Sequence, residues 1–491
     1  MSVRKTPEDR RRLGWTPVSP SRDGAARERA IAELVRVSPV ITAFGEHFAD
    51  SGHEISLVGG SVRDALLGRL GNDLDFTTSA HPDEVELLLA GHVDALWDIG
   101  KAFGTIGARI GQLTCEITTY RTEKYDVESR KPVVEYGTSL QGDLGRRDFT
   151  VNAMAVTLPD LRFVDPFNGV SDLASGQLRT PGRPEDSFDD DPLRMLRAAR
   201  FAAQLDFEVE ASVLRAIVGM AERLSIVSAE RIRDEFSKLV LSDNPRAGLR
   251  ILVDTKLADQ FIPELPALQL EIDEHHRHKD VYEHTLTVVE QAIDLELDGP
   301  DLTLRLAALL HDIGKPATRR FEAGGGVSFH HHEMVGARMT RKRMKALRYP
   351  KDLVEDVAQL VELHLRFHGY ADGEWTDSAV RRYVRDAGPL LTQLHSLTRA
   401  DCTTRNRRKA ASLAAAYTSL EERIATLAEA EELAAIRPDL DGNEIMQILG
   451  IPPGRAVGEA YQHLLETRLD RGPLDRDEAV EVLRTWWNAR Q

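Results

Sequence analysis

Two aspartates one residue apart, in the stretch DLDFTT (73–78), are the first residues whose type and spacing could do chemistry. Side chains of a β-strand alternate between its faces, so Asp73 and Asp75 would share one face while Leu74 points into the core. Two carboxylates this close repel each other unless a cation lies between them. Mg²⁺ typically binds one or two carboxylates together with substrate phosphate oxygens. The pair therefore indicates a Mg²⁺ site, although a solvated strand face is the commoner explanation of such a pair taken alone.

Residues on either side of the aspartate pair strengthen this interpretation. Glu116, in TCEITTY, is the candidate for a third carboxylate on a neighbouring strand, which would complete a two-metal clamp for in-line displacement at phosphorus. Gly59 and Gly60 follow a predicted strand and precede a helical run, and backbone amides at such a turn suit a phosphate. Arg63 lies in the first helical turn, where it can reach the same anion. Together these residues predict a site for a triphosphate and a metal ion.

The elements that must position these residues are of two kinds. Stretches rich in β-branched and apolar residues, bounded by Gly, Asp and Pro, predict strands in the N-terminal part. These stretches are EISLVGG (54–60), DLDFTT (73–78), ARIG (108–111), TCEITTY (114–120), VVEY (133–136) and RFVDP (162–166). Helical patterns such as PDEVELLLAG (82–91) lie between them. After Pro184 the strand signals vanish and apolar residues recur at helical spacing, so the fold class is α+β, a mixed head followed by an all-helical body.

Composition limits the functions that this chain can have. With 491 residues, 42% hydrophobic and 29% charged, it has the balance of a folded multidomain protein. The net charge of −16 means that any contact with nucleic acid must come from a local basic patch. Two distant cysteines, Cys115 and Cys402, exclude a disulfide scaffold and a cysteine-based zinc site. No leader-like segment or apolar stretch long enough for a membrane span is present, so we expect a cytoplasmic protein with no membrane partner.

Five motifs in a fixed order identify a family. They are GGSVRDALLG…DLDFTT (59–78), GRRDFTVNAMAV (145–156), FVDPFNGVSDL (163–173), DDPLRMLRAARFAAQLDF (190–207) and SAERIRDEFSKLV (228–240). This series resembles the class II tRNA nucleotidyltransferases and bacterial poly(A) polymerases, within the polymerase-beta-like nucleotidyltransferase superfamily. The departure is small, because Asp190 stands where the family usually has Glu. The N-terminal extension and the C-terminal tail lie outside the shared motifs.

The resemblance implies a reaction and assigns roles in it. The 3′-hydroxyl of tRNA would attack the α-phosphate of CTP or ATP, and pyrophosphate would leave. Asp73 and Asp75 would hold Mg²⁺, and Glu116 would be the third carboxylate or would activate the hydroxyl. The residues implied for triphosphate binding are Gly59, Gly60, Arg63 and Arg147.

A helix beginning near Pro192 is implied to select the nucleotide. C and A both present an exocyclic amino donor beside a ring-nitrogen acceptor. A carboxylate can accept from the amino group while a guanidinium donates to the ring nitrogen, so Asp191 and Arg194, one turn apart, could read C and A and mismatch U and G. The family is described as using such a pair as a protein template. Arg197 and Arg200 would extend the pattern toward base or phosphate.

Histidines and aspartates in the body form a second candidate site. On helices they supply imidazole and carboxylate ligands for a divalent metal of unidentified kind. Residues 280–405 resemble the HD phosphohydrolase domain. The resemblance implies His284, His311, Asp312 and Asp401 as metal ligands, and His332 and His364 as candidates for a second metal or for phosphate. A metal bound here would either catalyse hydrolysis of phosphate esters or, as the alternative, serve only to stabilise the packing of the helices.

These observations divide the chain into five parts. We expect an N-terminal extension with one amphipathic helix (1–37), a catalytic nucleotidyltransferase head (38–182), a helical neck that selects nucleotide and binds RNA (183–265), an HD domain (266–410) and a helical tail (411–491).

Addition of C, C and A to tRNA is the favoured function, and three alternatives stay open. A poly(A) polymerase shares every head motif, but such enzymes tend to carry strongly basic extensions, whereas this chain is acidic. A partial enzyme that adds only CC or only A is not excluded by the sequence. The alternative of another class is an HD phosphohydrolase whose head merely binds RNA. The oligomeric state cannot be read from the sequence.

Overall fold

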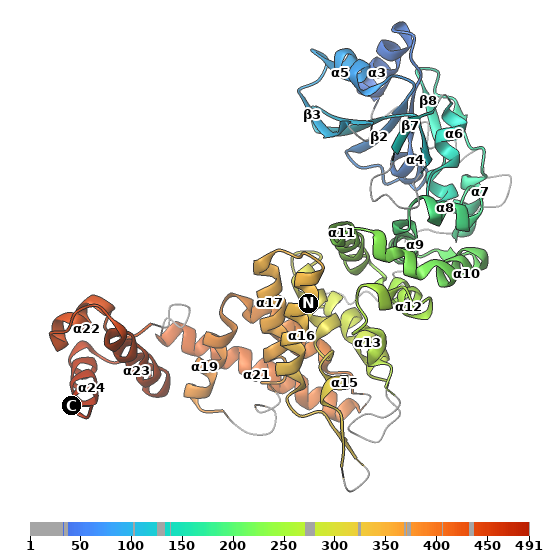
Figure 1. The fold of residues 1–491 in the computed structure, drawn as a ribbon. Coiled ribbons are helices and arrows are strands. Elements are labelled where there is room, and N and C mark those ends of the chain that lie inside the picture. The colour runs from blue at the N-terminus through green and yellow to red at the C-terminus, as the bar shows by residue number, and fades with distance from the viewer. Residues whose placement is uncertain are drawn as a thin grey trace. The chain divides into compact units, whose positions relative to one another are not determined.

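The computed structural model describes residues 33, 38–101, 104–124, 133–137, 139–270, 280–322, 326–367, 370, 375–404, 406–431 and 437–490. Of the predicted N-terminal extension, only Glu33 falls within these residues, so the helix expected there lies outside the described part. The chain divides into two units, Met1–Phe261 and Ile262–Gln491, each described by itself below. Figure 1 shows a sheet with helices at the N-terminal end of the chain and helices through most of the rest.

A seven-stranded sheet in the order β3-β4-β5-β2-β1-β8-β9 forms the centre of the first unit. Its strands are β1 (Ile55–Val58), β2 (Asp73–Thr78), β3 (Ala95–Gly100), β4 (Thr105–Ile110), β5 (Leu113–Thr119), β8 (Ala155–Leu158) and β9 (Phe163–Val164). Strands β2 and β5 run parallel, and the other neighbours are antiparallel. A separate pair joins β6 (Arg121–Lys124) and β7 (Val133–Tyr136). All the predicted strands are confirmed, whereas β3, β6 and β8 were not predicted.

Helices cover this sheet and continue into the neck. They are α3 (Ser38–Asp50), α4 (Gly59–Leu66), α5 (Pro82–Leu89), α6 (Leu140–Gly145), α7 (Gly169–Ser175), α8 (Pro184–Asp190), α9 (Leu193–Leu205), α10 (Ala211–Met220), α11 (Ala229–Val240) and α12 (Pro245–Asp254). Helix α3 packs against β1 and β8, and α5 packs against β4 and β5. The mixed head and the helical neck therefore agree with the predicted fold class.

Helix α9 is the centre of the neck. Its apolar residues Leu193, Leu196 and Ala203 are buried, as their helical spacing predicts. It packs against α11 and α12, and Gly248 of α12 allows the close approach. A Cβ atom at Gly248 would stand 2.6 Å from the carbonyl oxygen of Ala199. The position of α9 therefore depends on a backbone-to-backbone contact that only glycine permits.

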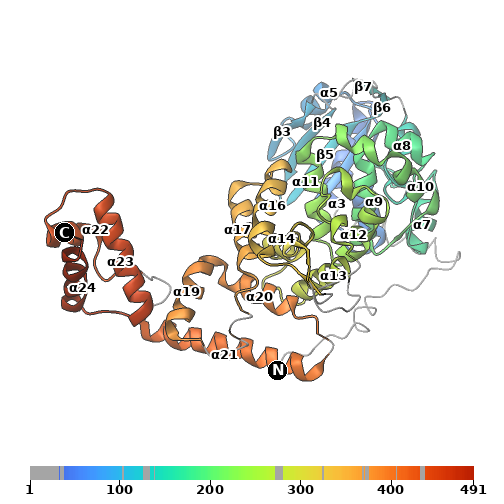
Figure 2. The same cartoon turned by 60° about the horizontal axis from the view of Figure 1, so that its bottom comes forward.

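The second unit is built from helices. They are α13 (Val281–Ile293), α14 (Leu302–Leu310), α15 (Lys315–Thr318), α16 (His332–Ala346), α17 (Lys351–Leu363), α19 (Asp377–Ala387), α20 (Leu391–Asp401), α21 (Arg407–Glu431), α22 (Gly442–Leu449), α23 (Arg455–Arg471) and α24 (Arg476–Asn488). Helices α13, α14, α17 and α20 pack on one another. Helices α22, α23 and α24 lie together at the C-terminal end of the chain (Figure 2). They share a small core of their own that includes Leu440, Ile445 and Leu464.

The prediction of an all-helical chain after Pro184 is wrong in two places. Strand β11 (Glu208–Val209) pairs in parallel with β10 (Gln177–Leu178), and β12 (Arg320–Phe321) pairs with β13 (Val327–Ser328). Each of these strands has two residues, too few for an alternating apolar pattern to show in the sequence. No helix among the described residues is long and apolar enough to cross a membrane.

The close contact at Gly248 predicts a contrast between two glycines. We expect Gly248→Ala to lower the free energy of unfolding by about 1–3 kcal/mol, because the new methyl group must displace α9. Gly219, in α10, has open space where its Cβ would stand. Gly219→Ala should therefore raise stability by about 0.4–1 kcal/mol by restricting the unfolded chain. Thermal unfolding of both variants measures this, and equal shifts of the same sign would contradict the packing described for α9.

Candidate active site and metal centre

The glycine turn after β1 lies directly beside the aspartate pair. Gly59 has a φ of +67°, and a Cβ atom there would stand 3.1 Å from Nη1 of Arg147 and 3.3 Å from Oδ2 of Asp75. At Gly60 a Cβ atom would stand 3.5 Å from Nη2 of Arg63. Glycine is required at the first position because of its positive φ and leaves the start of α4 open. The turn, both predicted arginines and Asp75 therefore converge, as the sequence predicted.

Three carboxylates share one face of the sheet. Asp75 on β2 is the register partner of Glu116 on the parallel strand β5, and Asp73 lies two residues before Asp75. Burial raises the pKa of Asp75, and Asp73 raises it further, while Arg147 and Arg63 act to lower it. The pKa of Glu116 is raised by burial, by Asp75 and by Asp73. The carboxylates thus repel one another, which is the condition under which a divalent cation binds between them.

The two arginines predicted to bind the triphosphate, Arg63 and Arg147, are held by other side chains of the head. Nη1 of Arg63 donates to Oδ1 of Asn152 at 2.6 Å, and Nη2 of Arg63 donates to Asp64 at 2.9 Å. Nη2 of Arg147 donates to Asp143 at 3.1 Å. These bonds fix both guanidinium groups beside Asp75, so two positive charges are positioned before any anion arrives.

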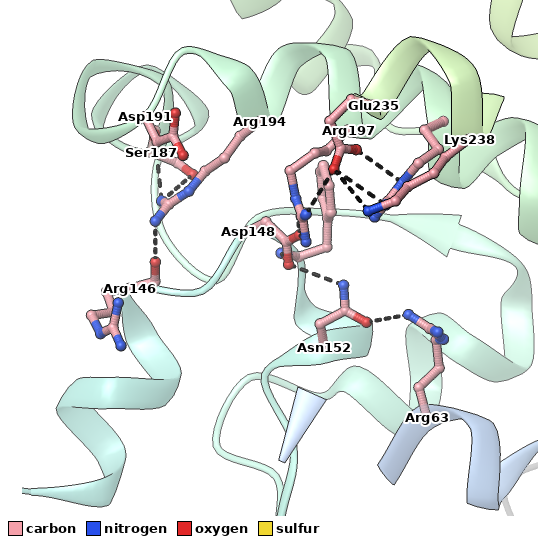
Figure 3. A network of polar contacts seen from close by, with 12 residues as sticks. Arg63, Arg146, Asp148, Asn152, Ser187, Asp191, Arg194, Arg197, Glu235 and Lys238 are labelled. Atoms are coloured by element: carbon pink, nitrogen blue, oxygen red, sulfur yellow. Dashed lines mark hydrogen bonds and ion pairs between the residues drawn. The ribbon is translucent and has the colours of Figure 1, made fainter. Parts of the chain in front are cut away.

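The predicted selecting pair lies at the start of α9, and the structure shows what holds each member (Figure 3). Nη1 of Arg194 donates to the hydroxyl of Ser187 at 2.9 Å, and Nη2 donates to the backbone oxygen of Arg146 at 2.6 Å. Asp191 accepts from the backbone amide of Leu193 at 3.1 Å. It also forms an ion pair with Arg231 at 2.7 Å. Among the described residues the direct acceptors of Arg194 are neutral oxygens, and it has a charge partner in Asp148, whose pKa it helps to lower.

Arg197 and Arg200 lie farther along α9 and already have acidic partners. Arg197 donates to Asp148 from Nε at 2.8 Å and from Nη2 at 2.5 Å. Glu235 of α11 lies 3.4 Å from Arg197 and 3.1 Å from Arg200. Figure 3 shows Glu235 between the neck helices, facing Arg197. The structure gives both arginines internal ion pairs, and their contact with a nucleotide stays a prediction.

The six predicted residues of the second site come together within the second unit. They form two groups, His284 with His311 and Asp401, and Asp312 with His332 and His364, and the ligand atoms of each group lie within 4.8 Å of one another. Asp312 joins the groups, because its Oδ2 lies 3.2 Å from Nε2 of His311 and its Oδ1 lies 3.3 Å from Nε2 of His332. The geometry therefore places Asp312 between the two ligand sets that the sequence had kept apart.

Three of these histidines are oriented by backbone carbonyl groups. Nδ1 of His311 bonds to the backbone oxygen of Ala308 at 2.8 Å, and Nδ1 of His332 bonds to that of Phe329 at 2.8 Å. Nδ1 of His364 bonds to the backbone oxygen of Val361 at 2.6 Å. A carbonyl oxygen can only accept, so each Nδ1 carries a hydrogen and each Nε2 points into the cluster. All three Nε2 atoms are buried with no hydrogen-bond partner among the described residues. Buried imidazoles fixed in this way fit a divalent metal ion.

The charges of the cluster also favour a cation. Burial acts to lower the pKa of His311, but Asp312 and Asp401 raise it to about 9. Burial and the neighbouring His311 lower the pKa of His364 to about 3. The cluster therefore stabilises positive charge at one imidazole and keeps another neutral and free to bind. Gly314 makes the arrangement possible, since a Cβ atom there would stand 2.1 Å from the oxygen of His332.

Comparison with known proteins agrees with both sites. Residues 55–179 match the "Poly A polymerase head domain", 206–268 the "Probable RNA and SrmB- binding site of polymerase A", and 281–432 the "HD domain". The A-adding tRNA nucleotidyltransferase of Deinococcus radiodurans is 36% identical over 420 residues, covering 84% of this chain and 91% of that protein. The chain belongs to the tRNA nucleotidyltransferase and poly(A) polymerase family.

Two further relatives show how far the likeness extends. A CCA-adding enzyme of Streptococcus suis is 42% identical over 229 residues, but the match covers 46% of this chain and 55% of the relative. The crystal structure of the Bacillus stearothermophilus CCA-adding enzyme in complex with CTP has a TM-score of 0.65 at 22% identity, covering 96% of this chain and 99% of that one. At that identity the structure shows a shared fold.

Four acidic and basic residues in or near these sites were not singled out from the sequence. Asp143 holds Arg146 and Arg147, and Asp148 and Glu235 hold the arginines of α9. Nζ of Lys315 lies 2.9 Å from Oδ2 of Asp312 in the HD cluster. The motifs RRDFT, SAERIRDEF and HDIGKP contain three of the four, so the signal was present, but only the structure shows which partner each residue holds.

The geometry of the HD cluster predicts that the purified protein retains a divalent metal. His364→Ala should lower the affinity for that metal about 10- to 100-fold, since it removes one fixed ligand. Elemental analysis after dialysis against a chelator measures the loss. His463→Ala is the matched control, because His463 stacks on Trp486 in the C-terminal helices. Equal metal content in wild type and His364→Ala would contradict this assignment.

Proposed function

We propose that the protein adds C, C and A to the 3′ end of tRNA, with CTP and ATP as donors and pyrophosphate as product. The observation that carries this proposal is the convergence of Asp75, Glu116, Arg63 and Arg147 on the glycine turn at the start of α4. The names of the relatives support nucleotide addition to tRNA, because they are an A-adding tRNA nucleotidyltransferase and a CCA-adding enzyme, and the second name supports addition of all three nucleotides.

The chemistry follows from the charges at the site. The backbone amides of the glycine turn, with Arg63 and Arg147, bind and orient the triphosphate. Mg²⁺ held by Asp73 and Asp75 would neutralise negative charge on the reacting phosphates. Glu116, whose pKa is raised by burial and by the aspartates, accepts the proton of the tRNA 3′-hydroxyl. That oxygen then bonds to the α-phosphorus as the bond to pyrophosphate breaks.

Selection between nucleotides rests on Asp191 and Arg194. Arg194 is buried, and its direct hydrogen-bond acceptors in the described part of the chain are the neutral oxygens of Ser187 and Arg146. A guanidinium held in this way can donate to the ring nitrogen of a base while Asp191 accepts from the neighbouring exocyclic amino group. Both C and A have this pattern, which supports one protein surface for both nucleotides.

Replacing Arg194 tests the selecting pair. Arg194→Ala should reduce the preference for CTP and ATP over UTP and GTP by about tenfold or more, because a good paired contact contributes about 1–3 kcal/mol of discrimination. Arg194→Lys should not restore the preference, since lysine lacks the planar donor pair. Competition between labelled nucleotides measures the ratio. Unchanged selectivity in both variants would refute the proposed role.

A-only addition is the second candidate, because the relative that covers 84% of this chain is an A-adding enzyme. Three tRNA substrates separate the candidates, ending before CCA, after C and after CC. A CCA-adding enzyme completes all three with CTP and ATP, whereas an A-adding enzyme extends only the third. A long tail of A would indicate a poly(A) polymerase.

The same assay tests the carboxylates. Asp73→Ala and Asp75→Ala should each reduce addition by at least about 10³-fold, because the charge on the phosphates is then left uncompensated. Asp50→Ala is the control, since Asp50 is an exposed aspartate at the end of α3. Addition that persists in the first two variants would refute the metal assignment.

The HD cluster supports a second activity, hydrolysis of a phosphate ester at the divalent metal. Lys315 beside Asp312 places a positive charge for a phosphate next to the buried histidines. Under this proposal His311→Ala abolishes phosphohydrolase activity and leaves nucleotide addition intact. Loss of both activities would instead mean that the cluster is structural.

A further inference from the structure

The face of the head sheet that carries the carboxylates continues beyond them onto β4 and β3. Register partners on neighbouring strands share a face. One row therefore runs from Asp75 through Glu116 and Gly107 to Trp97. A second row runs from Asp73 through Thr114 to Arg109.

Trp97 and Arg109 are both accessible on this face. Trp97 is 36% exposed, although it is a large aromatic residue. Arg109 is exposed, and no side-chain partner of its guanidinium is found in the described part of the chain. Gly107 separates Trp97 from Glu116 and has no side chain to block the space between them. The surface beside the carboxylates thus offers one flat aromatic ring and one unpaired cation.

The sheet order tells which substrate this surface faces. The triphosphate turn follows β1, on one side of β2, whereas Glu116 lies on β5, on the other side. In phosphoryl transfer the attacking and leaving oxygens lie roughly in line. Pyrophosphate therefore leaves toward β1, and the attacking 3′-hydroxyl must come from the side of β5, β4 and β3. That is the side of Trp97 and Arg109.

Distance and charge fit a single-stranded RNA end. Strands are about 4.8 Å apart, so Trp97 lies about 10 Å from Glu116 across the sheet. A stacked strand rises about 3.4 Å per nucleotide, so this span holds about three nucleotides. Three carboxylates would repel RNA phosphates, and a cation on the same face offsets that repulsion.

We propose that Trp97 and Arg109 form the binding tract for the single-stranded 3′ end of tRNA, with the indole stacking on a base and the guanidinium contacting a phosphate. This rests on the proposed function, because it names the path by which the acceptor strand reaches Glu116. Aromatic side chains serve single-stranded nucleic acids in this way because every base has a π-face.

A binding experiment without nucleotides tests the tract. The probes are two RNA minihelices of the tRNA acceptor stem, one ending in single-stranded nucleotides up to CC and one blunt. Trp97→Ala should weaken binding of the first about tenfold and leave the second unchanged, whereas Trp97→Phe should retain most of the affinity. Arg109→Ala should lower the slope of log K against log salt by about 0.7.

Matched controls separate this inference from the proposed function. Arg162→Ala removes an exposed arginine at the opposite edge of the same sheet, beside β9, and should change nothing. Unchanged CTP binding by Trp97→Ala shows that the head remains folded. If Trp97→Ala binds both minihelices as tightly as the wild-type protein does, the proposed RNA-binding role of Trp97 is refuted. If wild type adds nothing to any tRNA, the proposed function fails while the binding comparison still stands.

Discussion

The ion pair between Asp148 and Arg197 is the interaction on which the geometry of the head depends. Asp148 belongs to the loop that also carries Arg147, and Arg197 belongs to the helix that carries Arg194. Burial acts to raise the pKa of Asp148, yet Arg197 and Asn152 outweigh it and keep the pKa below its usual value. Removing one partner of such a pair leaves a buried charge uncompensated and costs about 3–5 kcal/mol. The loop that carries Arg147 and helix α9 are therefore held in one fixed relation.

Metal-ligand candidates of the HD cluster are also held in fixed positions, but by hydrogen bonds to the backbone. Three of its histidines are oriented by backbone carbonyl groups rather than by opposite charges, as the contact between Nδ1 of His364 and the oxygen of Val361 shows. A backbone carbonyl cannot rotate away or ionise, so the direction of each of these three Nε2 atoms follows from the ends of helices. These three lie at helix boundaries: His311 follows α14, His332 begins α16 and His364 follows α17.

The sequence predicted which candidate residues come together better than it predicted which partners hold them. Alternation along a strand was enough to place Asp73 and Asp75 on one face, because the period of a strand is two and a slip of one residue would turn both into the core. The partners of Arg194 and Arg197 could not be predicted, since Arg146 and Asp148 lie far away in sequence. Strand β3 was missed because Asp98 and Gly100 interrupt its apolar pattern, and its pairing with β4 contains an irregularity between Trp97 and Gly100.

The two sites differ in what completes them. Each HD group brings three protein ligands to one point, so a metal ion there needs little from a substrate. In the head, Asp73 is exposed, Glu116 is partly desolvated but still reaches solvent, and both repel Asp75, so the carboxylates leave room that phosphate oxygens can fill. Under the proposed function, metal binding in the head would therefore be coupled to the triphosphate, whereas metal binding in the HD cluster would not. A chain with both arrangements would keep one metal resident while the other exchanged with each nucleotide added.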